Sequence, residues 1–194
     1  MKISRVPWAT GLVALAAVLS RAGPGWEDAL VLDRAVASAQ GWRFWTGHLV
    51  HLSSGHLGWN IAVFGAAGGW LELLAPRAMR LYLLWAPPLV GVAILALDRE
   101  IGRYAGLSGI AAGLVVALAL TQLTRQDESR PLWAAVLGLV AVKILYETMS
   151  GSAVLSGGFR PVPIAHIAGG ITGCLLFSFI ARRRRSPADL PPVG

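Results

Sequence analysis

The sequence predicts an all-α membrane protein, a bundle of six transmembrane helices. Hydrophobic residues make up 55% of the 194 residues and charged residues only 14%, whereas soluble domains carry about 25% charged residues. The mean hydropathy is +0.61. The apolar residues are grouped in blocks that approach the roughly 20 residues a helix needs to cross a bilayer. Backbone polar groups in lipid must be satisfied within the segment, so these blocks predict helices.

Six such blocks follow one another along the chain. They are about 7–20, 56–74, 78–97, 106–124, 131–150 and 162–181. The first is short, and it could instead be a secretory signal, because Lys2 and Arg5 precede it and Ala37-Ser38-Ala39 resembles a cleavage site. Five charged residues separate that site from the block, which favours a retained span.

The blocks and their connections predict one membrane domain in residues 1–185. Residues 186–194 contain three prolines and are expected to form a disordered cytoplasmic tail. The stretch 23–45 mixes tryptophans and aliphatic residues with charges, as in segments that lie in the membrane interface.

The distribution of basic residues predicts the orientation, because the cytoplasmic side carries the excess. One set of span ends holds ten basic residues: Lys2, Arg5, Arg77, Arg80, Arg125, Arg130, Arg182, Arg183, Arg184 and Arg185. The other holds six: Arg21, Arg34, Arg43, Arg99, Arg103 and Arg160. With six spans, both termini are then cytoplasmic. The cluster at 182–185 follows a span directly, which indicates contact with anionic lipid rather than nucleic acid.

Three polar residues lie near the start of the even-numbered spans, namely His56, Ser108 and His166. All even-numbered spans run from the outer to the inner side in this topology. The three side chains are therefore expected to converge at one depth, near the outer face.

Ser108 has the surroundings of a nucleophile. Gly106 and Gly109 bracket it and permit close backbone approach, and Gly109 with Gly113 forms a small-xxx-small helix contact. A serine at a helix start also lies beside free N–H groups that can bind an oxyanion. The alternative is a structural serine bonded to a nearby carbonyl.

His166 shares a helical face with Gly169 and Gly173, which again form a small-xxx-small pattern. Two helices with small faces can bring Ser108 and His166 within hydrogen-bond reach. A histidine that merely packs against a hydroxyl is the alternative. Ionisable groups are costly inside membranes and are usually functional, which favours a Ser108–His166 site.

His56 and Asn60 are spaced i, i+4, and both can donate hydrogen bonds to a developing oxyanion. His48 and His51 precede them, and three histidines within nine residues also raise a metal site as an alternative. No His-Glu-x-x-His pattern and no nearby carboxylate accompanies them. We therefore expect no metal and no cofactor.

Besides Arg80, three charged residues lie within the apolar blocks. Lys143 and Glu147 are spaced i, i+4 and are expected to form a structural ion pair, although Glu147 could also line a cavity. Glu72 ends the second block on the cytoplasmic side, far from the other polar residues, and is expected to be structural.

These residues together resemble the rhomboid family of intramembrane serine proteases, over nearly the whole chain. Gly106-Leu107-Ser108-Gly109 is similar to the family's nucleophile motif. Ala165-His166 with the two following glycines is similar to its base motif. His56-x-x-x-Asn60, with His51 upstream, is similar to its oxyanion motif. Two weaker elements, Trp42-Arg43 and Gly68-Gly69-x-x-Glu72, also resemble the family.

The resemblance implies a six-helix rhomboid-like bundle in which Ser108 attacks the scissile carbonyl of a membrane-anchored protein. His166 moves the proton, and His56, Asn60 and the Ser108 N–H bind the oxyanion. This dyad needs no carboxylate. Two alternatives remain open: a catalytically inactive rhomboid-like protein that binds membrane clients, and a small transporter.

The short chain and the strings around Ser108 and at Tyr146-Glu147 resemble the rhombosortase subgroup. That implies a bacterial inner-membrane enzyme that processes C-terminal Gly-Gly sorting tails. One position departs from the pattern: four residues after the serine, where an aromatic residue or a histidine is usual, this chain has Ala112. The departure leaves open what orients the ring of His166.

Overall fold

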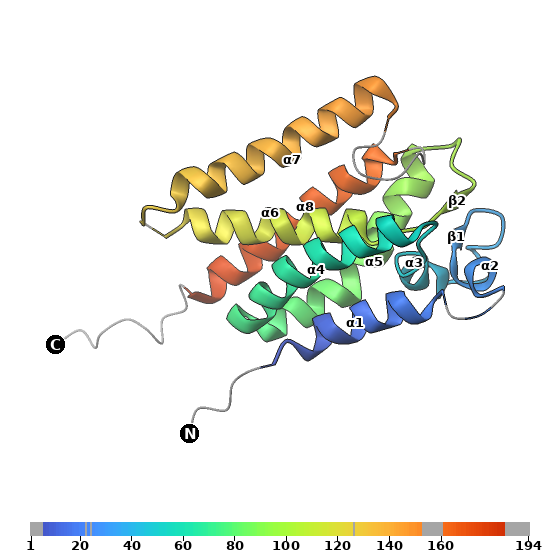
Figure 1. Cartoon of the computed structure of the whole chain (residues 1–194), viewed down its shortest axis with the longest axis horizontal. Helices are drawn as coiled ribbons and strands as arrows, with labels where there is room; N and C mark the ends of the chain where they lie inside the picture. Colours follow the sequence, from blue (N-terminus) through green and yellow to red (C-terminus); the bar gives the residue numbers. More distant parts are fainter. Residues whose placement is uncertain (1–5, 22, 24, 126, 153–160, 185–194) are drawn as a thin grey trace.

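The chain folds into a helical bundle with a small cap of loops at one end, as a computed structural model shows (Figure 1). The structure describes residues 6–21, 23, 25–125, 127–152 and 161–184. The predicted tail, 186–194, lies outside these residues. The elements in chain order are α1 (Trp8–Leu19), α2 (Trp26–Leu30), β1 (Leu32–Asp33), α3 (Arg43–Thr46), α4 (Ser54–Leu74), α5 (Pro76–Leu97), β2 (Arg103–Tyr104), α6 (Ser108–Leu123), α7 (Arg130–Ser150) and α8 (Pro163–Arg184).

Four of these helices, α4, α5, α7 and α8, are long and apolar enough to cross a membrane. The helices α1 and α6 are apolar but shorter, with 12 and 16 residues. At 1.5 Å per residue they measure about 18 and 24 Å, less than a hydrocarbon core of roughly 30 Å. The predicted helical membrane fold is confirmed, whereas six complete crossings remain a prediction.

Local sequence signals explain where several helices begin and end. The Ser53 side chain accepts a hydrogen bond from His56 N at 3.1 Å, so α4 starts two residues earlier than the apolar block. Pro76 opens α5, where a missing N–H leaves no bond unmade. Gly151, with φ +63°, ends α7 in the left-handed region.

The helix α6 forms the centre of the bundle. Eleven of its 16 residues are buried, and it contacts α4, α7 and α8. By contrast, α7 lies along the outside of the bundle (Figure 1), and Glu147 is its only buried residue. Many of its apolar side chains are exposed, as expected of a helix in lipid.

The opposite flank of the bundle is closed by α1, which is bound to α4 through a carboxylate. Glu72, 3% exposed, accepts hydrogen bonds from Ala9 N at 3.0 Å, Thr10 N at 2.8 Å and Thr10 Oγ1 at 2.7 Å. These donors belong to the first turn of α1, where backbone N–H groups lack helical partners. The predicted structural role of Glu72 has this physical basis.

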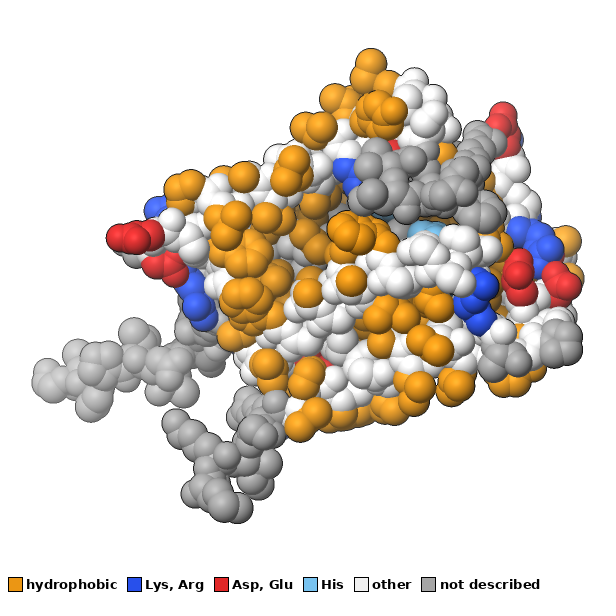
Figure 2. Space-filling model, in the orientation of Figure 1, with side chains coloured by type: hydrophobic (Ala, Val, Ile, Leu, Met, Phe, Trp, Pro, Cys, Tyr) orange, Lys and Arg blue, Asp and Glu red, His pale blue; other side chains and the backbone are white. Residues whose placement is uncertain are grey.

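The short elements gather at one end of the bundle, away from the start of α1 and the end of α8 (Figure 1). There β1 pairs with β2 antiparallel, with Leu32 opposite Tyr104. Trp26, Trp42 and Trp45 are exposed in this region. Figure 2 shows apolar side chains over the middle of the molecule and most charged side chains toward its two ends, the distribution expected of a protein embedded in a bilayer.

Candidate functional site

A cavity of about 370 Å³ lies between α4, α6, α7 and α8. Its walls are mostly apolar, and a few polar groups converge on it, as in many binding sites. The convergent polar side chains are those of His56, Asn60, Ser108, Lys143, Glu147 and His166. The structure thus brings together the residues that the sequence analysis placed at one depth, and it adds Lys143 and Glu147 to them.

Ser108 is the first residue of α6, and the turn before it is held at three points. Gly106 has φ +128°, a conformation that favours glycine. Its N–H donates to Gly47 O at 3.1 Å, and its carbonyl accepts from the Tyr104 hydroxyl at 2.8 Å. The next N–H, of Leu107, donates to His51 Nε2 at 3.3 Å. The backbone that presents Ser108 to the cavity is therefore fixed.

The contact with Leu107 requires a neutral His51. Its Nε2 is the acceptor, so the proton lies on Nδ1, 2.9 Å from Leu49 O. Burial lowers the pKa of His51 to about 4, which keeps the ring neutral near pH 7. His48 is bound similarly, with Nε2 3.0 Å from Pro87 O, and burial lowers its pKa to about 4 as well.

His56 and Asn60 form the α4 wall of the cavity. The ring of His56 lies against Gly106, where a Cβ would come within 3.1 Å of His56 Cε1. Asn60 is 3% exposed, and its Nδ2 donates to His56 O at 2.9 Å. Within the described part of the chain, His56 Nδ1 is buried and has no hydrogen-bond partner. Both side chains keep donor capacity beyond these contacts.

The start of α6 is in backbone contact with the start of α8. A Cβ on Gly109 would lie 2.7 Å from Ala165 O, so these two backbones touch. Ser108 precedes Gly109 in the sequence and His166 follows Ala165, and both side chains line the cavity. The hydrogen bonds between described residues do not include one from Ser108 Oγ to the imidazole, and apo sites commonly show such contacts lengthened.

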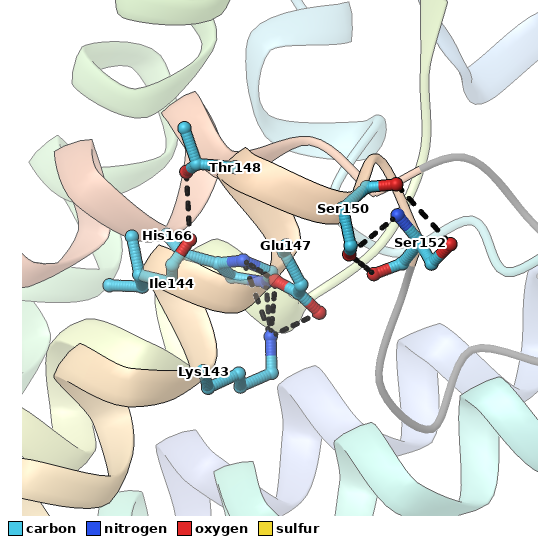
Figure 3. A network of polar contacts seen from close by, with 7 residues as sticks. All are labelled: Lys143, Ile144, Glu147, Thr148, Ser150, Ser152 and His166. Carbon is cyan, nitrogen blue, oxygen red and sulfur yellow. Dashed lines mark hydrogen bonds and ion pairs between the residues drawn. The ribbon is translucent and has the colours of Figure 1, made fainter.

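The imidazole of His166 contacts a carboxylate instead (Figure 3). Its Nδ1 lies 3.0 Å from Glu147 Oε2, and Lys143 Nζ lies 2.8 Å from each oxygen of the same carboxylate. The expected Lys143–Glu147 ion pair is present. The contact with His166 could not be read from the i, i+4 spacing, because it depends on how α7 packs against α8.

The three histidines at 48, 51 and 56 contact backbone groups and one another. Among the residues that the structure describes, no group of three or more His, Cys, Asp or Glu side chains is placed to hold a metal ion. His48 and His51 are occupied by backbone groups, and His51 and His56 meet edge to face at 5.2 Å between ring centroids.

Comparison with known proteins identifies the family. A model of the Rhomboid domain matches residues 38–183, which is 146 of the 194 residues. The chain belongs to the rhomboid family. This family consists typically of intramembrane serine proteases that act on membrane proteins. No curated protein matches the chain.

The rhomboid match includes α3 to α8, and therefore every residue around the cavity. It also includes Trp42-Arg43, whose arginine organises the cap of loops. Arg43 is 7% exposed, and its guanidinium donates to Asp28 O, Val31 O and Gln40 Oε1 at 2.6–2.8 Å. This arginine thus has a structural role.

Proposed function

We propose that this rhomboid is an active intramembrane serine endopeptidase in which Ser108 is the nucleophile and His166 the general base. The observation that carries the proposal is the backbone contact of Gly109 with Ala165, because the adjacent Ser108 and His166 both line the same cavity. A nucleophile with a base beside it at a helix start is the arrangement that acyl transfer requires.

The reaction follows from the groups around the cavity. Ser108 Oγ attacks the scissile carbonyl while His166 takes its proton, and the imidazolium then returns this proton to the leaving amine. The Ser108 N–H at the start of α6, together with His56 and Asn60, stabilises the tetrahedral oxyanion. One such donor is typically worth about 10²–10³ in rate.

The proposed topology has six spans in a bacterial inner membrane, with both termini cytoplasmic. It puts Ser108 near the outer face, so cleavage falls near the outer boundary of the substrate's span. An intact helix shields its carbonyls, so a cleavable segment contains weak helix formers such as glycine. The resemblance to rhombosortases supports C-terminal Gly-Gly sorting tails as substrates.

The alternatives explain fewer of the observations. An inactive client-binding rhomboid would not need the Ser108 turn fixed by His51 and Tyr104. A transporter would account for the Lys143–Glu147 pair, which adjoins His166, but not for the glycines that bracket Ser108.

The proposal is tested with Ser108→Ala and His166→Ala in purified protein and a membrane-anchored substrate. Each variant is expected to lose at least about 10³-fold in cleavage rate while inserting normally. A fluorophosphonate is expected to label the wild type at Ser108, as located by mass spectrometry. Cleavage by either variant at more than a few per cent of the wild-type rate would contradict the dyad.

A further inference from the structure

The carboxylate of Glu147 occupies an unusual position for an acid in a membrane helix. It is 2% exposed and is the only buried residue of α7. A buried charge is costly unless it is paired and hydrogen-bonded. The helix thus buries this charge completely while none of its apolar side chains is fully buried, which indicates a specific role for this carboxylate rather than a contribution to packing.

The contacts of Glu147 divide between two kinds of partner (Figure 3). Lys143 Nζ, at 2.8 Å from both oxygens, neutralises the charge. His166 Nδ1, at 3.0 Å from Oε2, is the other partner. An ionised carboxylate only accepts hydrogen bonds. The short contact therefore requires a proton on Nδ1 of the ring.

Lys143 does not compete for the ring nitrogens. Its Nζ lies 3.4 Å from Nδ1 and 3.5 Å from Nε2 of His166. One ammonium nitrogen cannot lie along the in-plane lone pairs of both nitrogens at once, and both distances are long for a hydrogen bond. Lys143 therefore acts mainly on the carboxylate, and Nε2 of His166, a residue that lines the cavity, is not held by a short hydrogen bond from the lysine.

We propose that Glu147 is a positioning residue that holds the proton of His166 on Nδ1 and so leaves Nε2 free to accept the proton of Ser108. The inference rests on the proposed function and extends the predicted dyad. It also answers the question raised by Ala112, because the ring is oriented from α7 rather than from α6.

Because Lys143 fixes which way an amide at position 147 turns, the isosteric variant Glu147→Gln tests this proposal. In Glu147→Gln, the lysine can only donate, so the amide oxygen turns toward it and the amide NH₂ faces His166. The NH₂ donates to Nδ1, which places the ring proton on Nε2, where it blocks the base. We expect kcat to fall by up to about 10⁴-fold, the loss found for the amide replacement of a triad carboxylate, with KM little changed.

Replacing Lys143 as well should restore part of the kcat that Glu147→Gln loses. In Lys143→Met/Glu147→Gln the amide oxygen is free to face Nδ1, so the double variant is expected to be at least about tenfold faster than Glu147→Gln. A purely structural role predicts the opposite, because two substitutions in one buried cluster destabilise more than one. A double variant no faster than Glu147→Gln would overturn the proposal.

Glu72→Gln is the matched control, because Glu72 is similarly buried but accepts hydrogen bonds from α1. It is expected to lower thermal stability and to leave kcat per folded enzyme unchanged. The ring tautomer is read directly from ¹⁵N-histidine NMR, with His166→Ala used for assignment. This measurement needs no turnover, so it tests Glu147 even if Ser108 proves inactive. A tautomer unchanged in Glu147→Gln would refute the proposal.

Discussion

The central helix α6 is flanked by α8 and α7, which contact it in opposite ways. Toward α8 the two backbones touch, and Cβ atoms on Gly113, Gly169 or Gly173 would overlap a carbonyl of the facing helix. Toward α7 the contact is made by side chains around a cavity. Close packing on one side fixes how α6 and α8, which carry the proposed nucleophile and base, lie against each other, and the cavity lies on the other side.

The largest expected effect comes from adding one methyl group on the packed side. Gly169→Ala forces its Cβ into the carbonyl oxygen of Gly109, which cannot move without displacing α6. Overpacking of this kind costs about 3 kcal/mol or more. We expect the variant to unfold at clearly lower temperature in detergent and to lose cleavage.

Gly170→Ala is the control for this prediction. It lies one residue further along α8, and a Cβ there meets nothing within 4 Å. It is expected to retain wild-type stability and rate. If Gly169→Ala and Gly170→Ala had the same stability and cleavage rate, close backbone packing would not be what holds α6 and α8 together.

On the cavity side, substitutions are expected to reduce the rate without unfolding the protein. The double variant His56→Ala/Asn60→Ala removes two proposed oxyanion donors, so kcat should fall by about 10²-fold or more. The single variants should lose less, because either donor can partly replace the other. Steady-state cleavage measures kcat, and a parallel thermal melt measures stability. An unchanged kcat in the double variant would show that these residues are structural.

The smallest change in stability is expected for a substitution on the exposed side of α7. Gly138 lies within this helix, and a Cβ there would meet nothing within 4 Å. Gly138→Ala should stabilise the helix by about 0.5–1 kcal/mol and leave cleavage unchanged. A loss of stability as large as that of Gly169→Ala would show that α7 packs as closely as α8.

The long helices of this fold can be predicted from the sequence alone, because the length and apolarity of a segment determine whether it forms a membrane helix. The six predicted blocks correspond to α1, α4, α5, α6, α7 and α8, with boundaries that differ by at most three residues. The shifts arise from local groups that hydropathy does not register, such as the Ser53 cap. The spacing of glycines likewise indicates which helix faces pack closely.

The connections between distant residues could not be predicted in this way. His51 is placed upstream of the oxyanion residues by sequence, but its bond to Leu107 N joins positions 56 residues apart. The contact of Glu147 with His166 depends on the rotation of α7, for which an outward-facing apolar helix gives no periodic signal. Buried polar partners are set by tertiary packing, so spacing alone suggests candidates but cannot pair them.

The hydrogen bonds of Glu72 have a consequence for the limits of the domain. The Rhomboid match begins at residue 38, after α1, yet this carboxylate within the matched region is satisfied by donors at the start of α1. A fragment cut at the boundary of the match would leave that charge buried without partners, at a cost of several kcal/mol. The unit that can fold therefore includes the first helix, and the family boundary is not a safe place to truncate the chain.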